Sequence, residues 1–259
     1  MDLFLKDRAA IVGGASQGIG YGIAHMLAAE GARVAITARH ESQLSRAAER
    51  ISQETGGNVL AIPADCRRAE DCERVIVCAR EAFGGLDILV NNDGAPPLGE
   101  IASFDDGAWQ KAVEQNLMYV VRMTRAAVPH MKARGGGAIV NITAISAIQP
   151  IAKFALSVAT WGGVIGFAKT LSIEEAPFGI RVNTICPGYI ETSRLEKVFA
   201  AGGQDPNVVR HKLESEVPLG RIGTVDDIAS LVALLVSPRG SYITGATIQV
   251  DGGLLRAVR

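Results

Sequence analysis

Gly13-Gly14-Ala15-Ser16-Gln17-Gly18-Ile19-Gly20, GGASQGIG, joins a short apolar run to a helical pattern. Glycines let a backbone turn sharply and approach a pyrophosphate, whose charge the N-terminus of the next helix stabilises. A glycine pattern is informative when it lies between a first strand and a helix, as this one does. The stretch therefore predicts a phosphate-binding loop near the start of an α/β fold.

Short apolar runs and longer amphipathic segments alternate almost to the end of the chain. Runs rich in Val and Ile without strict alternation suit strands covered on both faces, as in a parallel sheet. Repeated strand, helix and strand units with no dividing linker predict one three-layer, doubly wound α/β domain over residues 1–259. The expected strands are residues 9–14, 33–37, 58–63, 86–92, 137–143, 180–186 and 246–250. The expected helices are residues 18–30, 42–54, 69–82, 107–133, 155–175 and 225–237.

The composition is that of a globular chain, with 259 residues, of which 48% are hydrophobic and 20% charged. This length supports one substantial core. A formal net charge of -1 favours neither nucleic acid nor an anionic membrane as a partner. We expect a small-molecule substrate or ligand.

The sequence predicts neither a metal site nor a targeting segment. Its cysteines, Cys66, Cys72, Cys78 and Cys186, lack CxxC spacing, and its His, Asp and Glu residues do not cluster as metal ligands do. We expect buried or inert thiols, since a chain of this length needs no disulfides. The charged N-terminal residues contain no apolar run suited to a signal peptide or a membrane span, which predicts a cytoplasmic protein.

One region departs from the alternating pattern. From Ile190 to about Leu219 the chain is polar and contains Gly202-Gly203 and two prolines. It follows the sixth expected strand, at the sheet edge where ligands bind in such folds. Two interpretations are open, a substrate lid at about residues 190–219 and an ordinary surface excursion.

Several motifs follow the glycine loop in a fixed order, and together they resemble the short-chain dehydrogenase/reductase (SDR) family. The spacing of Gly14, Gly18 and Gly20 is similar to the family's Gly-x-x-x-Gly-x-Gly loop. The other motifs are Asp65, Asn91-Asn92-Asp93-Gly94, Asn116, Pro187-Gly188 and Val250-Asp251-Gly252-Gly253. The resemblance implies a Rossmann-type sheet of seven parallel strands, a nicotinamide dinucleotide and commonly a homotetramer.

The resemblance also implies which residues contact the cofactor. The glycine loop matches the family's phosphate loop, Asp65 its adenine contact and Asn91 its cofactor-side strand end. Ile190 and Thr192 match positions near the nicotinamide carboxamide. The expected cofactor-binding residues are Gly14, Ser16, Gly18, Ile19, Arg39, Asp65, Asn91, Gly94, Ile190 and Thr192.

The end of the second expected strand favours NADP(H) over NAD(H). An NAD enzyme needs a carboxylate there for the ribose 2'-hydroxyl, whereas a 2'-phosphate needs a cation. The chain has Ala38 at that position and Arg39 immediately after it. A guanidinium binds phosphate with two hydrogen bonds. The alternative is that Arg39 is an exposed residue opening the next helix.

The family's catalytic residues are substituted in the alignment that the resemblance implies. Family members use a tyrosine, a lysine four residues later and a serine thirteen residues earlier. Similarity at residues 141–144 and 164–169 places Ala144 at the serine, Ser157 at the tyrosine and Trp161 at the lysine. These side chains supply neither the phenol nor the ammonium that the reaction uses. Asn116, which the family uses in a proton relay, is present.

Asp93 is the main candidate for a replacement acid, because the family usually has alanine at this position. A carboxylate near a bound cofactor can have its pKa raised enough to act as an acid. The alternative is an Asp-Gly turn at the strand end. Thr143 and Ser146 flank Ala144 and are possible substitute hydroxyls.

Three other side chains are weaker candidates. Lys153 lies one turn before Ser157, Tyr189 follows Pro187-Gly188, and His211 lies in the expected lid. A surface position is the plainer interpretation of Lys153 and His211.

Three functions are compatible with these observations. The first is an oxidoreductase that uses NADP(H) on a small carbonyl or alcohol through a divergent active site. The second is a catalytically impaired NADP(H)-binding pseudoenzyme that acts as a sensor or a partner subunit. The third is a non-redox lyase or isomerase that uses Asp93 or Ser157. Fold alone does not separate them.

Overall fold

The computed structural model describes residues 2–193, 195 and 205–256. Its strands are β1 Ala9–Gly13, β2 Arg33–Ala38, β3 Val59–Pro63, β4 Ile88–Asn91, β5 Gly137–Ile142, β6 Ile180–Pro187 and β7 Thr247–Val250. They form one parallel sheet of seven strands in the order β3-β2-β1-β4-β5-β6-β7. The predicted doubly wound sheet is confirmed. Its order reverses between β1 and β4, which is the point where such folds bind ligands.

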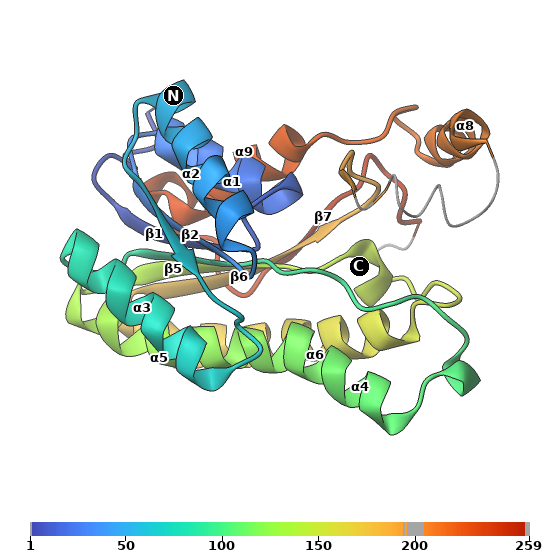
Figure 1. Ribbon diagram of the computed structural model, residues 1–259, viewed down its shortest axis with the longest axis horizontal. Helices are drawn as coiled ribbons and strands as arrows, with labels where there is room; N and C mark the ends of the chain where they lie inside the picture. Colours follow the sequence, from blue (N-terminus) through green and yellow to red (C-terminus); the bar gives the residue numbers. More distant parts are fainter. Residues whose placement is uncertain (1, 194, 196–204, 257–259) are drawn as a thin grey trace.

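Helices cover both faces of the sheet (Figure 1). The longer helices are α1 Gly18–Ala29, α2 Glu41–Thr55, α3 Ala69–Phe83, α5 Tyr119–Ala133, α6 Ala155–Glu175, α8 Pro206–Glu216 and α9 Val225–Val236. The shorter ones are α4 Asp106–Ala112 and the 3-10 turns η1 Ile101–Ser103, η3 Ile145–Ala147, η4 Ala176–Phe178 and η5 Pro238–Gly240. In Figure 1, α1, α2 and α9 lie above the sheet, and α3, α5 and α6 lie below it.

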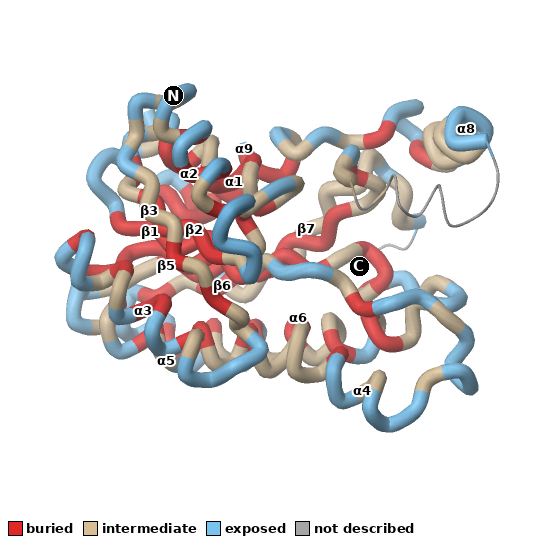
Figure 2. Tube along the Cα trace, in the orientation of Figure 1, coloured by how far each residue is buried: buried red, intermediate tan, exposed pale blue. Residues whose placement is uncertain are grey.

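Alternate strand residues enter two separate cores. In β1, Ala10 and Val12 pack under α1, α2 and α9, whereas Ala9 and Ile11 pack with α3, α5 and α6. All four side chains are fully buried, and the sheet is the most buried part of the trace in Figure 2. Burial on both faces explains why the strands read as continuous apolar runs.

The expected helix over residues 107–133 is divided in the structure. A π-helix, η2 Val113–Met118, lies between α4 and α5 and contains Asn116. The Asn116 Nδ2 group donates a hydrogen bond to Thr160 Oγ1 of α6 at 2.9 Å. The wider π-helical turn lets the buried Asn116 carboxamide bond to Thr160 on α6. A regular helical pattern of apolar residues does not predict such a turn.

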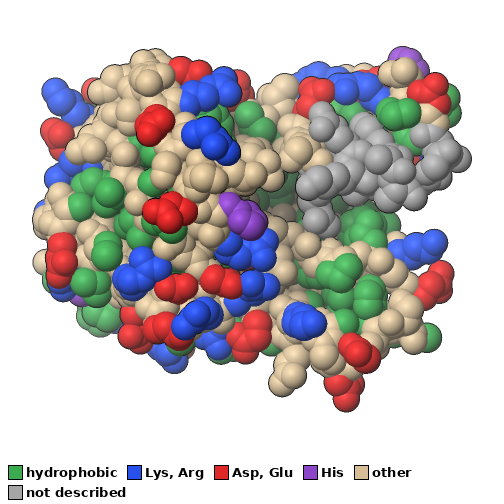
Figure 3. Space-filling model, viewed as in Figure 1, with side chains coloured by type: hydrophobic (Ala, Val, Ile, Leu, Met, Phe, Trp, Pro, Cys, Tyr) green, Lys and Arg blue, Asp and Glu red, His purple; other side chains and the backbone are tan. Residues whose placement is uncertain are grey.

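The polar segment after β6 contains a helix that the sequence pattern did not predict. Asp205 caps α8 by accepting a hydrogen bond from the Asn207 N–H at 2.8 Å. The helix stands apart from the main body in Figure 1, and Figure 3 shows this face hollowed between the two. Residues 194 and 196–204 of the expected lid lie outside the described residues. The lid stays a prediction.

Candidate active site

The turn from β1 into α1 requires glycine at two positions. Gly14 and Gly18 have φ angles of 55° and 62°, in the left-handed region that side chains rarely adopt. A Cβ on Gly14 would also lie 2.7 Å from the carbonyl oxygen of Asn92. The loop geometry thus depends on the residue types that the pattern singled out.

The N-terminus of α1 is available to a ligand. Within the described residues its N-cap, Gln17, makes no capping side-chain hydrogen bond, and the first turn has no acidic residue. The free N–H groups of a first helical turn attract anions. A Cβ added to Gly18 would lie 3.5 Å from Cγ2 of Thr192, an ordinary van der Waals distance. The residues here fit the pyrophosphate of a dinucleotide.

Arg39 is a free cation at the end of β2. The residue is exposed and forms no hydrogen bond or ion pair with the part of the chain that the structure describes. Its charge acts on the carboxyl groups of Asp65 and Asp93, where it opposes protonation. Ala38, the last residue of β2, supplies no carboxylate for a ribose hydroxyl. This pair of residues suits a phosphate better than a diol.

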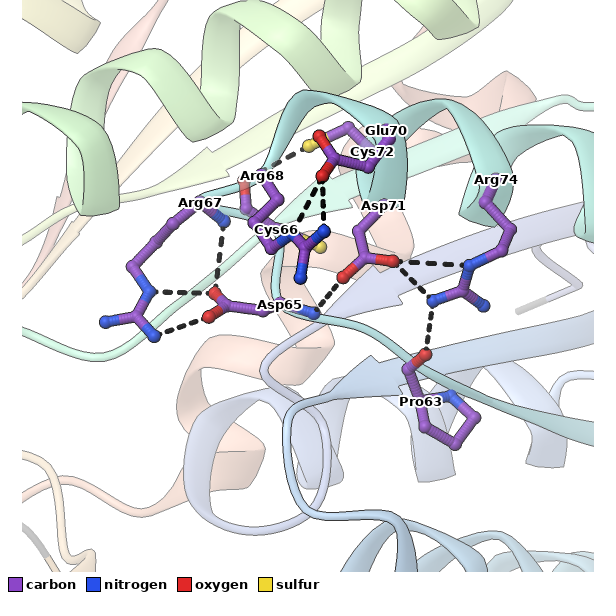
Figure 4. A network of polar contacts seen from close by, with 9 residues as sticks. All are labelled: Pro63, Asp65, Cys66, Arg67, Arg68, Glu70, Asp71, Cys72 and Arg74. Atoms are coloured by element: carbon purple, nitrogen blue, oxygen red, sulfur yellow. Dashed lines mark hydrogen bonds and ion pairs between the residues drawn. The ribbon is translucent and has the colours of Figure 1, made fainter.

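Asp65, the expected adenine contact, is held by its own neighbours (Figure 4). Arg67 donates from Nε and Nη2 to the two carboxylate oxygens at 2.8 and 2.5 Å. The Asp65 N–H donates to Asp71 Oδ2 at 3.0 Å. The hydrogen bonds from Arg67 hold the pKa of the Asp65 carboxyl below its usual value. A ligand that used this side chain would have to compete with Arg67.

The cysteines carry free thiols, as the sequence predicts. Cys72 Sγ donates to the carbonyl oxygen of Cys66 at 3.1 Å, beside the Asp65 cluster. Burial raises the pKa of Cys186 to about 11. Within the described ranges, no three His, Cys, Asp or Glu side chains form a group that could hold a metal ion.

The asparagines at the end of β4 hold parts of the fold together. Asn91 Nδ2 donates to Asn141 Oδ1 of β5 at 2.9 Å and to Thr124 Oγ1 of α5 at 3.3 Å. Asn92 Nδ2 donates to the Gly13 carbonyl at 3.1 Å. The Asn91 carboxamide therefore joins β4 to β5 and α5, and that of Asn92 holds the glycine loop against the end of β4.

Asp93 uses its side chain on the backbone of the next residue. Its Oδ1 accepts a hydrogen bond from the Gly94 N–H at 2.7 Å. Desolvation by the surrounding protein raises the pKa of the Asp93 carboxyl, and the charge of Arg39 opposes the rise. The residue is exposed at the surface of the described chain.

The three substituted catalytic positions have different surroundings. Ala144 follows β5 and precedes the turn η3, half-buried. Ser157 lies on α6 with 1% of its surface exposed, and its Oγ has no hydrogen-bond partner among the described residues. Trp161 lies one helical turn later, half-buried, next to the Thr160 that binds Asn116. None of these side chains can supply a phenol or a cation.

Trp161 and Asn116 line a pocket of about 10 Å³. This volume is close to that of a single water. The other lining residues are Asn91, Asp93, Gly94, Gln115, Tyr119, Val120, Ile142 and Val164. The structure thus brings together five of the predicted site residues, Asn91, Asp93, Gly94, Asn116 and Trp161, in a space too small for a substrate.

Thr143 and Ser146 differ in how their hydroxyls are used. Thr143 Oγ1 donates to the Ile185 carbonyl at 3.1 Å, so it belongs to the β5–β6 edge. Ser146 is 1% exposed, and its hydroxyl has no partner in the described part of the chain.

Ile190 lies beside Gly223, just before α9, and Thr192 lies beside the glycine loop. Ile190 is buried and pairs with Gly223 through an isolated β-bridge, so its side chain is part of the core. Thr192 Oγ1 donates to the Ile190 carbonyl at 3.3 Å. Of the two side chains, that of Thr192 lies opposite Gly18.

The remaining candidates for a replacement acid or base have other partners or face solvent. Tyr189 donates to Glu216 Oε2 of α8 at 3.2 Å, and burial raises the pKa of the Tyr189 phenol to about 12. Lys153 is exposed, and its backbone has a φ of 70°, in the left-handed region. His211 is exposed and lies 3.5 Å from Glu214. None of them replaces the missing tyrosine or lysine.

Sequence reasoning missed three residues of this site. Gln115 lines the pocket from the π-helix, and Thr160 anchors that helix to α6. Tyr119 accepts from the Asn92 N–H at 3.0 Å and lies under the glycine loop. No sequence signal singled out Thr160 among the polar residues of α6, and Gln115 depends on the unpredicted π-helix.

The geometry defines a Rossmann-type α/β protein, whose strand order reverses between β1 and β4. The family described as enoyl-(acyl carrier protein) reductase matches residues 14–255. The chain belongs to the short-chain dehydrogenase/reductase family of oxidoreductases.

Individual relatives match almost end to end. A 3-oxoacyl-acyl-carrier-protein reductase of Vibrio cholerae is 36% identical, over 96% of this chain and 98% of its own. The human dehydrogenase/reductase SDR family member 4 is 34% identical, over 96% of this chain and 88% of its own. The structure of an L-sorbose reductase of Gluconobacter frateurii, complexed with NADPH and L-sorbose, is 34% identical, has a TM-score of 0.95 and covers 100% of both chains.

Proposed function

We propose that this chain binds NADP(H) in the crevice at the switch point. The observation that carries the proposal is Arg39 at the end of β2, a cation without an ion pair in the described residues. The residue before it, Ala38, has no carboxylate that could bind a ribose hydroxyl. The uncapped N-terminus of α1 supports it, since its amides suit a pyrophosphate. A similar protein, the L-sorbose reductase, is described in complex with NADPH.

Calorimetric titration of the wild-type protein and Arg39→Ala with NADPH and NADH tests this proposal. A charged hydrogen bond contributes about 1.5–3 kcal/mol, so we expect Arg39→Ala to bind NADPH about 10- to 100-fold more weakly. NADH binding should change little. The control is Arg46→Ala, an exposed arginine on α2. Equal binding of NADPH by Arg39→Ala and the wild-type protein would contradict the proposed role of Arg39.

We further propose that the chain is catalytically impaired and works as an NADP(H) sensor or as the partner of an active subunit. Ala144, Ser157 and Trp161 carry this proposal, because hydride transfer to a carbonyl leaves an oxygen that needs a proton or a hydrogen bond. Loss of proton transfer lowers a rate roughly 10²- to 10⁴-fold, and loss of an oxyanion donor about 10²- to 10³-fold. When bound, NADP(H) supplies hydride chemistry, but these side chains supply no matching acid.

An oxidoreductase that acts on a small carbonyl or alcohol through a divergent active site is the second candidate function. Asp93 favours it, since its pKa is raised and it lines the same pocket as Asn116. In this function Asp93 would hold the proton that the tyrosine holds in relatives. The exposure of Asp93 and its hydrogen bond to Gly94 are the reasons why we place this function second.

Restoration of the family residues separates the two functions. We expect the triple variant Ala144→Ser, Ser157→Tyr and Trp161→Lys to gain NADPH-dependent turnover on a panel of small carbonyls where the parent has none. The measurement is the loss of NADPH absorbance with time. Turnover by the parent that disappears in Asp93→Asn would instead establish the divergent oxidoreductase.

We also propose that the chain forms a homotetramer. The resemblance of Ser241-Tyr242-Ile243-Thr244-Gly245 and residues 250–253 to the family's tetramer-forming end supports it. A second support is α6, which by length and composition alone is apolar enough to cross a membrane. In the fold it packs on β6 with one side and leaves Ile173 of its outer side 69% exposed. An exposed apolar side chain at this position suits contact with a second copy of the chain.

A further inference from the structure

The crevice has two halves with different residues. In this fold a dinucleotide lies across the switch point, with its pyrophosphate at the N-terminus of the first helix. On one side lie the ends of β2 and β3, with Ala38 and Arg39. On the other side lie the ends of β4 and β5 and the N-terminal part of α6. The adenosine and nicotinamide halves of the ligand would face these two sides separately.

On the side that would receive the nicotinamide half, Trp161 places an indole next to Asn116. Asn91 ends β4, Ile142 ends β5, and both line the pocket of about 10 Å³ that Trp161 closes from α6. Sites for small molecules are typically on the order of 300 to 1,000 Å³. This pocket has no room for a ribose with its attached ring beside the indole. The residues present therefore fit one half of a dinucleotide and not the other.

The helix that carries Trp161 is anchored on both sides of the indole. Thr160 accepts a hydrogen bond from Asn116 at 2.9 Å and donates one to the Leu156 carbonyl at 2.7 Å. Val164 is 1% exposed and belongs to the core under the sheet. A shift of the α6 backbone would break these contacts. Rotation of the indole is the remaining way to open this half of the crevice.

We infer that Trp161 excludes the nicotinamide half, and that the chain recognises adenosine nucleotides that carry a 2'-phosphate and a 5'-phosphate or diphosphate. The inference rests on the proposed binding of NADP(H), and it names the part of that ligand which supplies the affinity. Arg39 faces the 2'-phosphate, and the glycine loop with the N-terminus of α1 faces the 5'-phosphates. The nicotinamide ring and its ribose then remain in solvent and add no affinity.

Calorimetric titration with adenosine 2',5'-bisphosphate and with NADPH tests the inference. For the wild-type protein we expect dissociation constants within about threefold of each other. In Trp161→Ala, NADPH should bind at least about tenfold more tightly, while the affinity for the bisphosphate stays the same. Trp109→Ala, which removes the other tryptophan, on α4, is the control and should change neither value.

A fluorescence measurement on the wild-type protein keeps the inference testable if Trp161→Ala fails to fold. Emission from reduced nicotinamide changes when the ring leaves water. Because the inference keeps the ring in water, saturation with NADPH should leave that emission unchanged. The inference would be overturned if the wild-type protein bound NADPH far more tightly than the bisphosphate, or if the emission changed strongly. Either result would leave the proposed binding of NADP(H) intact. Binding of neither ligand would overturn the proposed function itself.

Discussion

At the scale of single residues, Gly14 shows how tightly the cofactor loop is constrained. Its φ of 55° excludes most side chains, and the carbonyl oxygen of Asn92 leaves no space for a Cβ. Asn92 is itself held by a hydrogen bond from its Nδ2 to the Gly13 carbonyl at 3.1 Å. The residue after β4 therefore supports the loop that follows β1. A methyl group added at Gly14 would disturb this loop and Asn92 together.

Gly14→Ala should destabilise the protein by at least about 1–2 kcal/mol, the cost of a left-handed backbone with a side chain, before any clash is counted. It should also weaken NADPH binding, because the loop must move. Gly107→Ala on α4 is the matched control, since its Cβ would make only ordinary contact with Asp105. That change should be neutral or stabilising. Urea unfolding of both variants measures the difference, and equal stabilities would contradict the proposed strain.

At the scale of elements, α9 begins with a complete capping box. Asp227 Oδ2 accepts from the Thr224 N–H at 2.7 Å, and Thr224 Oγ1 accepts from the Asp227 N–H at 3.4 Å. Arg221 also donates to Asp227, and this hydrogen bond is the largest cause of its strongly lowered pKa. Since α9 covers one face of the sheet, its first turn contributes to the stability of that layer.

Asp227→Asn should lower the free energy of unfolding by about 1 kcal/mol at pH 7, because it removes a negative charge that Arg221 and the helix N-terminus stabilise. The folded carboxyl has a lower pKa than the unfolded one. Its stabilisation is therefore complete above the unfolded value, about 3.9, and is lost as the pH falls below it. The difference between variant and wild type should shrink from pH 7 to pH 3 in urea unfolding. Asp226→Asn, at an exposed neighbour in the same turn, is the control and should change the stability at pH 7 less.

At the scale of the whole molecule, the two faces of α6 have different partners. Its inner residues pack under the sheet and against the π-helix, where Thr160 meets Asn116. Its outer side leaves Ile173 69% exposed, and Phe178 just beyond the helix is 50% exposed. Lys132 lies 3.8 Å from the centroid of the Phe178 ring. We expect the proposed assembly to cover this outer side.

Ile173→Arg should therefore lower the molar mass of the particle in light scattering, because a charge in an apolar interface is costly to bury. Ile101→Arg is the matched control, since Ile101 of η1 is equally exposed at 69% and lies on another element. It should leave the mass unchanged. A wild-type protein that is monomeric at micromolar concentration would remove the basis of the proposed assembly.

Much of the fold was predictable because it depends on neighbouring residues. Apolar runs predicted all seven strands to within a few residues, and the spacing of Gly14 and Gly18 predicted the loop between β1 and α1. The site was less predictable. Asp65 turned out to be paired with Arg67, and Gln115 joined the pocket from a π-turn that the pattern did not indicate.

Hydrophobic period and glycine spacing were sufficient for the sheet, its covering helices and the phosphate loop, since each reflects the conformational preferences of a short stretch of chain. The position of the Trp161 indole was not accessible in this way. It follows from contacts such as that between Asn116 and Thr160, 44 residues apart, which set how α6 lies against the sheet. Such contacts arise only when distant segments pack, because burial and hydrogen-bond partners are properties of the assembled core.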